Sequence, residues 1–133
     1  MSFINIHPDA KKDLEELMLL DRLSAVRILA MLQQLKADPT LLRKLLTHGY
    51  RDTIADRIDV NKWIRMQNAG HDVWRLKVTD LEQNGQKFRV IYTFANNRKS
   101  VHILAIKPRF EINYDDPSDA LASRIVLARS SLR

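Results

Sequence analysis

Three segments in the second half of the chain place basic side chains at alternate positions among apolar ones. This pattern constrains the fold more than any other feature, because successive side chains of a β-strand point to opposite faces of a sheet. In VWRLKVT, Trp74, Leu76 and Val78 share one face, whereas Arg75 and Lys77 share the other. The segment therefore predicts a strand with one apolar face and one cationic face.

The segment KFRVIYTF repeats this alternation, with Arg89 on one parity. The opposite parity, which we assign to the core together with Trp74, comprises Phe88, Val90, Tyr92 and Phe94. The link LEQNGQ contains Asn-Gly, a dipeptide suited to the positive backbone angles of a tight hairpin. Antiparallel pairing would place Arg89 beside Arg75 and Lys77, on a surface that faces a ligand and not the packed core.

The third segment, VHILAIK, is apolar at both parities, which predicts a central strand covered on both faces. Pro108 ends this strand, Arg109 follows at once, and Tyr114 comes shortly after. The three strands together predict a catalytic sheet.

Positive charge is concentrated around these strands. From Arg57 to Arg109, eleven Lys and Arg stand against four Asp and Glu, a net charge of +7, and the remainder carries eleven against twelve. A localised basic field suits a polyanion, of which nucleic acid is the commonest. A solvated face that keeps the protein soluble is the alternative interpretation.

The length of 133 residues and the 45% hydrophobic content predict a single domain, residues 1–133, with a core that needs no disulfide or metal ion to stabilise it. The chain contains no cysteine, so it has neither disulfides nor thiolate metal sites, which suits a reducing compartment. No signal-peptide pattern and no apolar run long enough to cross a bilayer are present. We therefore expect a cytoplasmic protein with no membrane contact.

The flanking sequence predicts an α+β fold: a small antiparallel-rich sheet packed against an N-terminal helical hairpin, with a C-terminal helix. Phe3 to Ile6 predicts an edge strand, and the hairpin begins at Pro8 and ends before Asp38-Pro39. The high density of leucine and methionine in the hairpin is typical of a core. Asp38 is expected to cap a short third helix that Gly49 ends.

The segment from Tyr50 to Gly70 fits neither the helical nor the strand period, and we expect mixed structure with a short helix near Asn61 to Gln67. After Tyr114, the run Asp115-Asp116-Pro117 predicts the start of the terminal helix. The buried stripe of this helix is expected to comprise Leu121, Ile125 and Ala128.

Motifs for nucleotide cofactors and metals are missing from the sequence. It has no phosphate loop, dinucleotide fingerprint or HExxH, and only three glycines. The four histidines lack short metal-ligand spacing, and Asp80 and Glu82 are expected in a turn. We predict no cofactor and no metal.

A surface of arginine, lysine and tyrosine can cleave RNA without metal, because the 2′-hydroxyl is a built-in nucleophile that mainly needs orientation and charge neutralisation. Arginine can hold two phosphate oxygens, and a lysine among cations has a depressed pKa and can act as a base. Tyrosine offers a ring for stacking and a hydroxyl. The same residues can also bind nucleic acid without any chemistry.

The order of a helical hairpin, VWRLKV, QKFRVIYTF, SVHILAIKPRFEINY and a terminal helix resembles the RelE/ParE toxin superfamily of bacterial toxin-antitoxin modules. The resemblance extends from Phe3 to about Ile125. It implies a compact microbial ribonuclease-like fold, and Tyr50 to Gly70 is an insertion relative to the smallest members. By position, Arg75 and Lys77 match the paired basic residues of one strand, and Arg89 matches the arginine of the next. Arg109 and Tyr114 match the arginine and tyrosine that follow the last strand.

The RelE branch cleaves messenger RNA in the ribosomal A site without metal. The resemblance therefore implies a type II toxin that acts as a ribosome-dependent endoribonuclease, with a cognate antitoxin and ribosome-bound messenger RNA as partners. The implied catalytic residues are Arg75, Lys77, Arg89, Arg109 and Tyr114. Two alternatives remain: a ParE-like gyrase-directed toxin without nuclease activity, and an inactive relative that binds nucleic acid or antitoxin.

Overall fold

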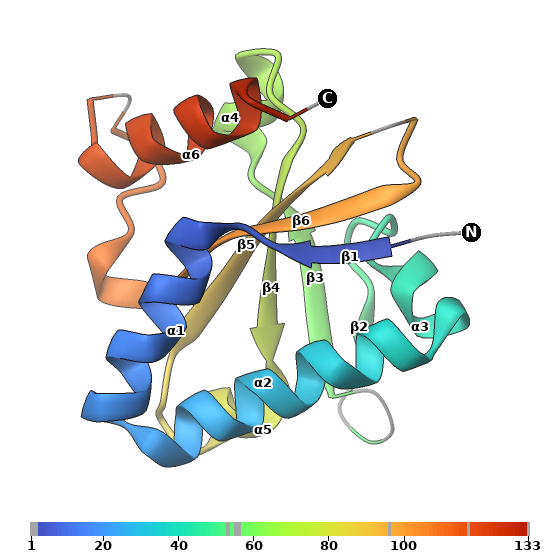
Figure 1. Cartoon of the computed structure of the whole chain (residues 1–133), viewed down its shortest axis with the longest axis vertical. Coiled ribbons are helices and arrows are strands. Elements are labelled where there is room, and N and C mark those ends of the chain that lie inside the picture. The colour runs from blue at the N-terminus through green and yellow to red at the C-terminus, as the bar shows by residue number, and fades with distance from the viewer. Residues whose placement is uncertain (1–2, 53, 55–56, 96, 117, 133) are drawn as a thin grey trace.

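The computed structural model describes residues 3–52, 54, 57–95, 97–116 and 118–132, which form an α+β fold around a six-stranded mixed sheet (Figure 1). The strand order is β1-β6-β5-β4-β3-β2; β1 runs parallel to β6, and the other neighbours are antiparallel. The strands are β1 (Phe3–Ile6), β2 (Arg51–Asp52), β3 (Ile58–Lys62), β4 (Val73–Val78), β5 (Phe88–Ala95) and β6 (Ser100–Pro108). The predicted α+β class is confirmed.

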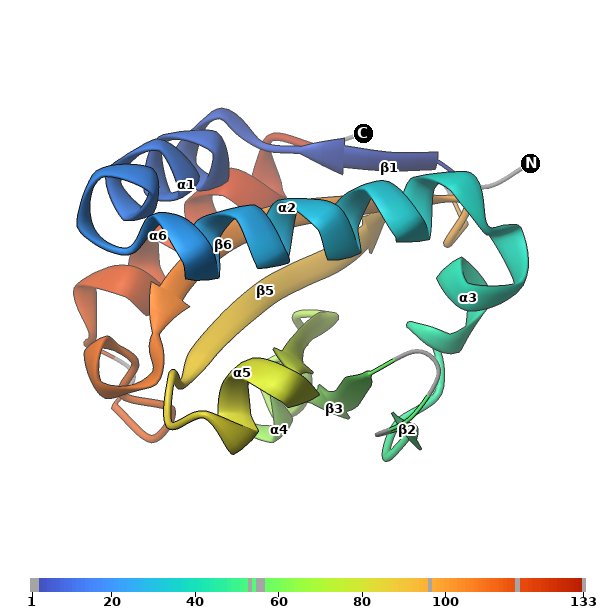
Figure 2. The same cartoon turned by 90° about the horizontal axis from the view of Figure 1, so that it is seen from below.

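The helices are α1 (Pro8–Leu20), α2 (Arg22–Ala37), α3 (Pro39–Lys44), α4 (Ile64–Asn68), α5 (Thr79–Gln83) and α6 (Ala120–Ser130), with a 3₁₀ turn, η1 (Arg109–Glu111). Figure 2 shows α2 running along the sheet with α1 beside it and α3 at its far end. Within the described ranges, no helix combines the length and apolarity needed to cross a membrane.

Aspartate side chains cap the starts of α2 and α3, and the sequence predicts the second of these caps, Asp38. Asp21 accepts a hydrogen bond from the backbone N–H of Ser24 (3.2 Å) at the start of α2. Asp38 accepts from Thr40 (3.0 Å) and Leu41 (3.2 Å) at the start of α3, which confirms its predicted role. The hairpin of α1 and α2 forms as expected.

The first core lies between the hairpin and one face of the sheet. Trp74, Val90 and Tyr92 are each at most 1% exposed there, and Phe88 packs against them at the margin. The hydroxyl of Tyr92 donates to the carbonyl of Leu45 (2.8 Å), so its one polar atom is satisfied. The predicted apolar parity of both strands is therefore confirmed.

The second core lies on the opposite face, beneath α4 and α6. It is built from Trp63, Met66, Val73, Ile91, Leu104, Ala105, Ile112, Ala122, Ile125 and Ala128. The N-terminal cap of α6 is Asp119, whose carboxylate accepts from the N–H of Ala122 (3.1 Å). The predicted start three residues earlier is wrong, because Asp116 instead binds Ser118 locally (2.9 Å); Pro117 lies outside the described residues.

The connection between β4 and β5 differs from the predicted tight hairpin. The strands do pair antiparallel, with Arg75 opposite Ile91, but α5 lies between them. The carbonyl of Leu81 accepts from Gln86 (2.9 Å), and Gly85 follows the helix with φ +79°. Asn-Gly therefore ends a helical turn here, and the glycine supplies the left-handed conformation that such an ending requires.

The segment from Tyr50 to Gly70 contributes two strands that its sequence does not reveal. Ile58 and Val60 of β3 are fully buried against the hairpin, and β3 pairs with β4. The helix expected near Asn61 to Gln67 is present as α4, displaced towards its C-terminal end. The segment thus extends the sheet and then crosses to the second core.

A single buried carboxylate joins both layers at β6. Asp13 of α1 is 5% exposed and accepts from the backbone N–H of Ile106 (3.0 Å). It also binds Arg124 of α6 through two nitrogens (3.1 and 2.7 Å) and Lys107 (3.2 Å). Arg124 in turn donates to the carbonyl of Leu104 (3.1 Å), where the β5–β6 register shifts.

We predict that Asp13→Ala lowers the free energy of unfolding by roughly 1.5–3 kcal/mol, since it leaves two partly buried cationic groups and a strand N–H without their acceptor. Urea denaturation followed by circular dichroism measures this change. Glu15→Ala, an exposed change on the same helix, serves as the control and is expected to stay within about 0.5 kcal/mol of the parent. Equal stability of the two variants would contradict the assignment.

Candidate functional site

The alternation in β4 produces the predicted cationic face. Trp74, Leu76 and Val78 are buried towards the hairpin, and Arg75 and Lys77 are half-buried on the other side. Pairing continues this face across the sheet, because residues directly opposite in neighbouring strands share a face. The cationic face thus comprises Arg75, Lys77, Arg89 and Lys107.

Three of the five predicted site residues come together around one ring. The guanidinium carbons of Arg75 and Arg109 each lie 4.7 Å from the centroid of the Tyr114 ring. Arg109 also donates to the carbonyl of Ile112 (3.1 Å), which holds it within the turn that follows β6. In the chain, Arg75 lies 34 positions before Arg109 and 39 positions before Tyr114. These three residues form one cluster, which we call the tyrosine cluster.

The segment that precedes β4 holds Tyr114 in place through contacts with its carbonyl and its ring. Its carbonyl accepts from Trp63 Nε1 (3.2 Å) and Arg65 Nε (2.8 Å), and the Trp63 ring packs edge-on against the Tyr114 ring at 4.8 Å. This role of Trp63 and Arg65 was not identified from the sequence. These contacts also occupy the ring, so the predicted use of Tyr114 as a free stacking platform does not match its surroundings.

Lys77 lies next to the cluster, two residues from Arg75 on the same face of β4. Its pKa is lowered, first by burial and then by the positive charges of Arg89 and Arg75. The carboxylates of Asp59 and Glu82 act in the opposite direction. The direction of the shift favours a larger neutral fraction of Lys77 near neutrality, as a general base requires.

Arg89 faces the predicted side but is not open to a ligand. Its side chain is 6% exposed and forms an ion pair with Glu82, and it donates to the carbonyl of Phe88 (2.9 Å). Glu82 reaches Arg89 from α5, the helix between β4 and β5, whereas the sequence predicted a turn at this position. The expectation that Arg89 stands apart from the packed structure is therefore wrong.

Two hollows of about 290 Å³ open on this side of the sheet. One, which we call the α4 hollow, is lined by residues 62–65, Arg75, Tyr114 and Asp115. The other is lined by Arg51, Asp59, Lys77, Thr79, Glu82 and Gln83. Each hollow thus includes one of the two basic residues of β4.

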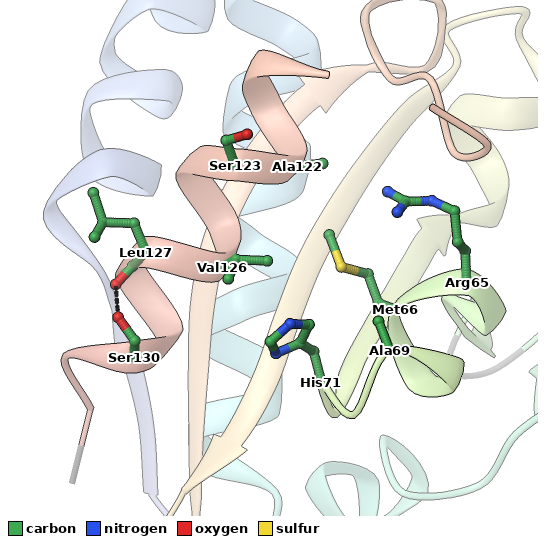
Figure 3. Close-up of a pocket in the computed structure, with 9 residues that line it drawn as sticks. All are labelled: Arg65, Met66, Ala69, His71, Ala122, Ser123, Val126, Leu127 and Ser130. Atoms are coloured by element: carbon green, nitrogen blue, oxygen red, sulfur yellow. Dashed lines mark hydrogen bonds between the residues drawn. The ribbon is translucent and has the colours of Figure 1, made fainter. Parts of the chain in front are cut away.

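A larger, more apolar groove of about 440 Å³ separates α4 from α6 (Figure 3). Met66 and His71 point towards α6 from one side, and Val126 points back towards them from the other. His71 Nδ1 lies 3.5 Å from Arg129 Nη1, so this histidine contributes to the α6 contact. Arg65 lines both this groove and the α4 hollow.

No group of three or more His, Cys, Asp or Glu side chains suited to a metal ion occurs within the described ranges. No protein-family model, curated protein or solved structure matches the chain.

We predict that Arg89→Ala destabilises the protein by roughly 1.5–3 kcal/mol, because it removes charge-assisted hydrogen bonds and leaves Glu82 without its partner. Thermal or urea unfolding of the purified variant measures this change. Lys87→Ala, at an exposed position just before the same strand, is the matched control and should be near neutral. If Arg89→Ala unfolds like the parent, its ion pair contributes nothing to stability.

Proposed function

We propose that this chain is a RelE-like toxin of a type II toxin-antitoxin module, a metal-independent endoribonuclease that cleaves messenger RNA on the ribosome and so inhibits translation. The observation that carries the proposal is the convergence of two guanidinium groups on Tyr114, beside a lysine with a lowered pKa. The resemblance of the sequence to the RelE/ParE superfamily supports the same conclusion. The proposed catalytic residues are Arg75, Lys77, Arg109 and Tyr114, and Arg89, which is buried beside Glu82, supports Lys77 through its charge.

In the proposed reaction, neutral Lys77 removes the proton from a 2′-hydroxyl, and the 2′-oxygen attacks the adjacent phosphorus. The bond from phosphorus to the 5′-oxygen breaks, leaving a 2′,3′-cyclic phosphate, and the 5′-oxygen takes a proton from water. Arg75 and Arg109 neutralise the charge of the phosphorane. Tyr114 fixes the separation of the two guanidinium groups, and Arg89 acts on Lys77 through its charge.

This mechanism predicts a pH dependence. Because Lys77 must be neutral to accept a proton, cleavage should rise with pH up to its lowered pKa and level off above it. Glu82→Gln removes a carboxylate that opposes the shift, so the rising limb should move to lower pH. Single-turnover cleavage of ribosome-bound messenger RNA across a pH series measures both profiles, and a profile that falls over this range would exclude Lys77 as the base.

We predict that Lys77→Met lowers the cleavage rate by roughly 10²–10⁴-fold without unfolding the protein, and that the parent cleaves in EDTA only when ribosomes are present. Lys87→Met, which changes an exposed lysine in the same way, is the control and should cleave normally. Recovery of activity by adding a divalent ion to ribosome-free reactions would contradict the proposal. Toxicity that survives Lys77→Met and produces DNA breaks would instead identify a gyrase-directed toxin.

A cognate antitoxin is the second proposed partner. The +7 region from Arg57 to Arg109 suits an acidic segment that is disordered when free and folds on contact. Co-purification with the product of a neighbouring reading frame should therefore weaken steeply as salt rises. Failure to capture any acidic partner from the native host would argue against a toxin-antitoxin module.

A further inference from the structure

Unpartnered buried polar atoms gather at the α4 hollow. Among the described residues, seven buried side-chain nitrogen or oxygen atoms have no hydrogen-bond partner. Three of the seven, Arg65 Nη2, Arg75 Nε and Tyr114 Oη, belong to residues that line this one hollow. Buried polar groups are nearly always partnered, so a cluster of exceptions indicates a place where a ligand completes the structure.

The charge of the hollow indicates an anion. Its lining carries the guanidinium groups of Arg65 and Arg75 against the carboxylate of Asp115. Lys62 also lines the hollow, but its ammonium lies 5.5 Å from the centroid of the Trp74 ring, on the hairpin side of the sheet. Arg65 is held in place by its bond from Nε to the Tyr114 carbonyl (2.8 Å), which leaves its terminal nitrogens for a ligand. A guanidinium that is already oriented loses little entropy when it binds a phosphate.

The hollow also has an apolar wall. Ile64 is 53% exposed at the start of α4, whereas its neighbour Trp63 is 2% exposed and holds Tyr114. An exposed β-branched side chain next to two guanidinium groups suits a ligand that combines a flat apolar ring with a phosphate. A nucleotide of single-stranded RNA has this combination.

We propose that the α4 hollow is a nucleotide-binding subsite for single-stranded RNA, in which Arg65 holds a phosphate and Ile64 supports the base. This inference rests on the proposed ribonuclease function and extends it, because Arg75 and Tyr114 belong both to the hollow and to the tyrosine cluster. The subsite binds a nucleotide next to the one whose phosphate is attacked. The segment before β4 therefore determines affinity and sequence preference in addition to holding Tyr114.

Binding of an uncleavable, fluorescein-labelled 2′-O-methyl RNA hexamer, followed by fluorescence anisotropy without ribosomes, tests the subsite. Arg65→Gln should weaken binding roughly tenfold, as expected for a lost charge-assisted contact. It should also reduce the slope of log affinity against log salt by about 0.7, the value for one phosphate contact on a single strand. Arg22→Gln, the same charge change at an exposed residue of α2, should do neither.

Two further variants separate binding from folding. Arg65 also supports Tyr114, so its loss can act through the fold, whereas the exposed Ile64 carries no such contact. Ile64→Asp should therefore weaken hexamer binding without lowering the melting temperature, because it adds a negative charge beside the phosphate. Ile64→Leu, which keeps the apolar wall, should bind like the parent.

The outcomes distinguish this inference from the proposed function. If ribosome-dependent cleavage is found but Arg65→Gln and Ile64→Asp bind the hexamer like Arg22→Gln, the subsite is wrong and the ribonuclease stands. If no cleavage is found but these two variants lose binding selectively, the subsite stands as an RNA-binding site and the catalytic proposal fails. Equal weakening by Arg22→Gln would show a diffuse electrostatic attraction and overturn the subsite.

Discussion

The bulge at Leu104 and the carboxylate of Asp13 together determine the geometry of the cationic face. Before the bulge, Ile103 faces the hairpin; after it, Ile106 does so and Lys107 turns to the opposite face beside Arg89. Without the extra residue, the side chain of Lys107 would point into the hairpin core. The bulge thus lets one strand be apolar on both faces in its middle and cationic on one face at its end.

A bulge at this point requires new hydrogen-bond partners, since β1 no longer pairs with β6 beyond Ile103. Asp13 accepts from the N–H of Ile106, and Arg124 donates to the carbonyl of Leu104. The bond between Asp13 and Arg124 then closes a loop of contacts that joins α1, β6 and α6. The layers on the two faces of the sheet are therefore fixed relative to the turn that carries Arg109.

Neutralisation of the cationic face is uneven, and this unevenness determines where its positive charge remains. Three cations lie beside carboxylates: Arg89 beside Glu82, Lys77 beside Asp59, and Lys107 beside Asp13. In the part of the chain that the structure describes, Arg75 and Arg109 have no carboxylate in an ion pair and pack on Tyr114 instead. Positive charge that is not cancelled therefore remains at the tyrosine cluster.

Local patterns in the sequence were sufficient for the strand faces and for part of the helical capping. The parity of β4 and β5 and the cap at Asp38 depend on neighbours within a few residues, and the structure confirms them. The burial of Arg89 was not predictable in this way, because it depends on α5 returning Glu82 to the strand. The position of Tyr114 likewise depends on distant residues. Arg65 precedes it by 49 positions and Trp63 by 51, and no periodic pattern in the sequence indicates these contacts.

Contacts with residues far away in the chain determine the position of Tyr114. Its carbonyl is held by Trp63 and Arg65, and its ring is held between side chains of the sheet and of the turn after β6. The hydroxyl, the one side-chain polar atom of this residue, is buried and has no hydrogen-bond partner among the described residues. A residue that is held in this way needs little further ordering when a ligand binds beside it. In the proposed ribonuclease, the segment before β4 is therefore part of the site, because it fixes the ring on which both arginines rest.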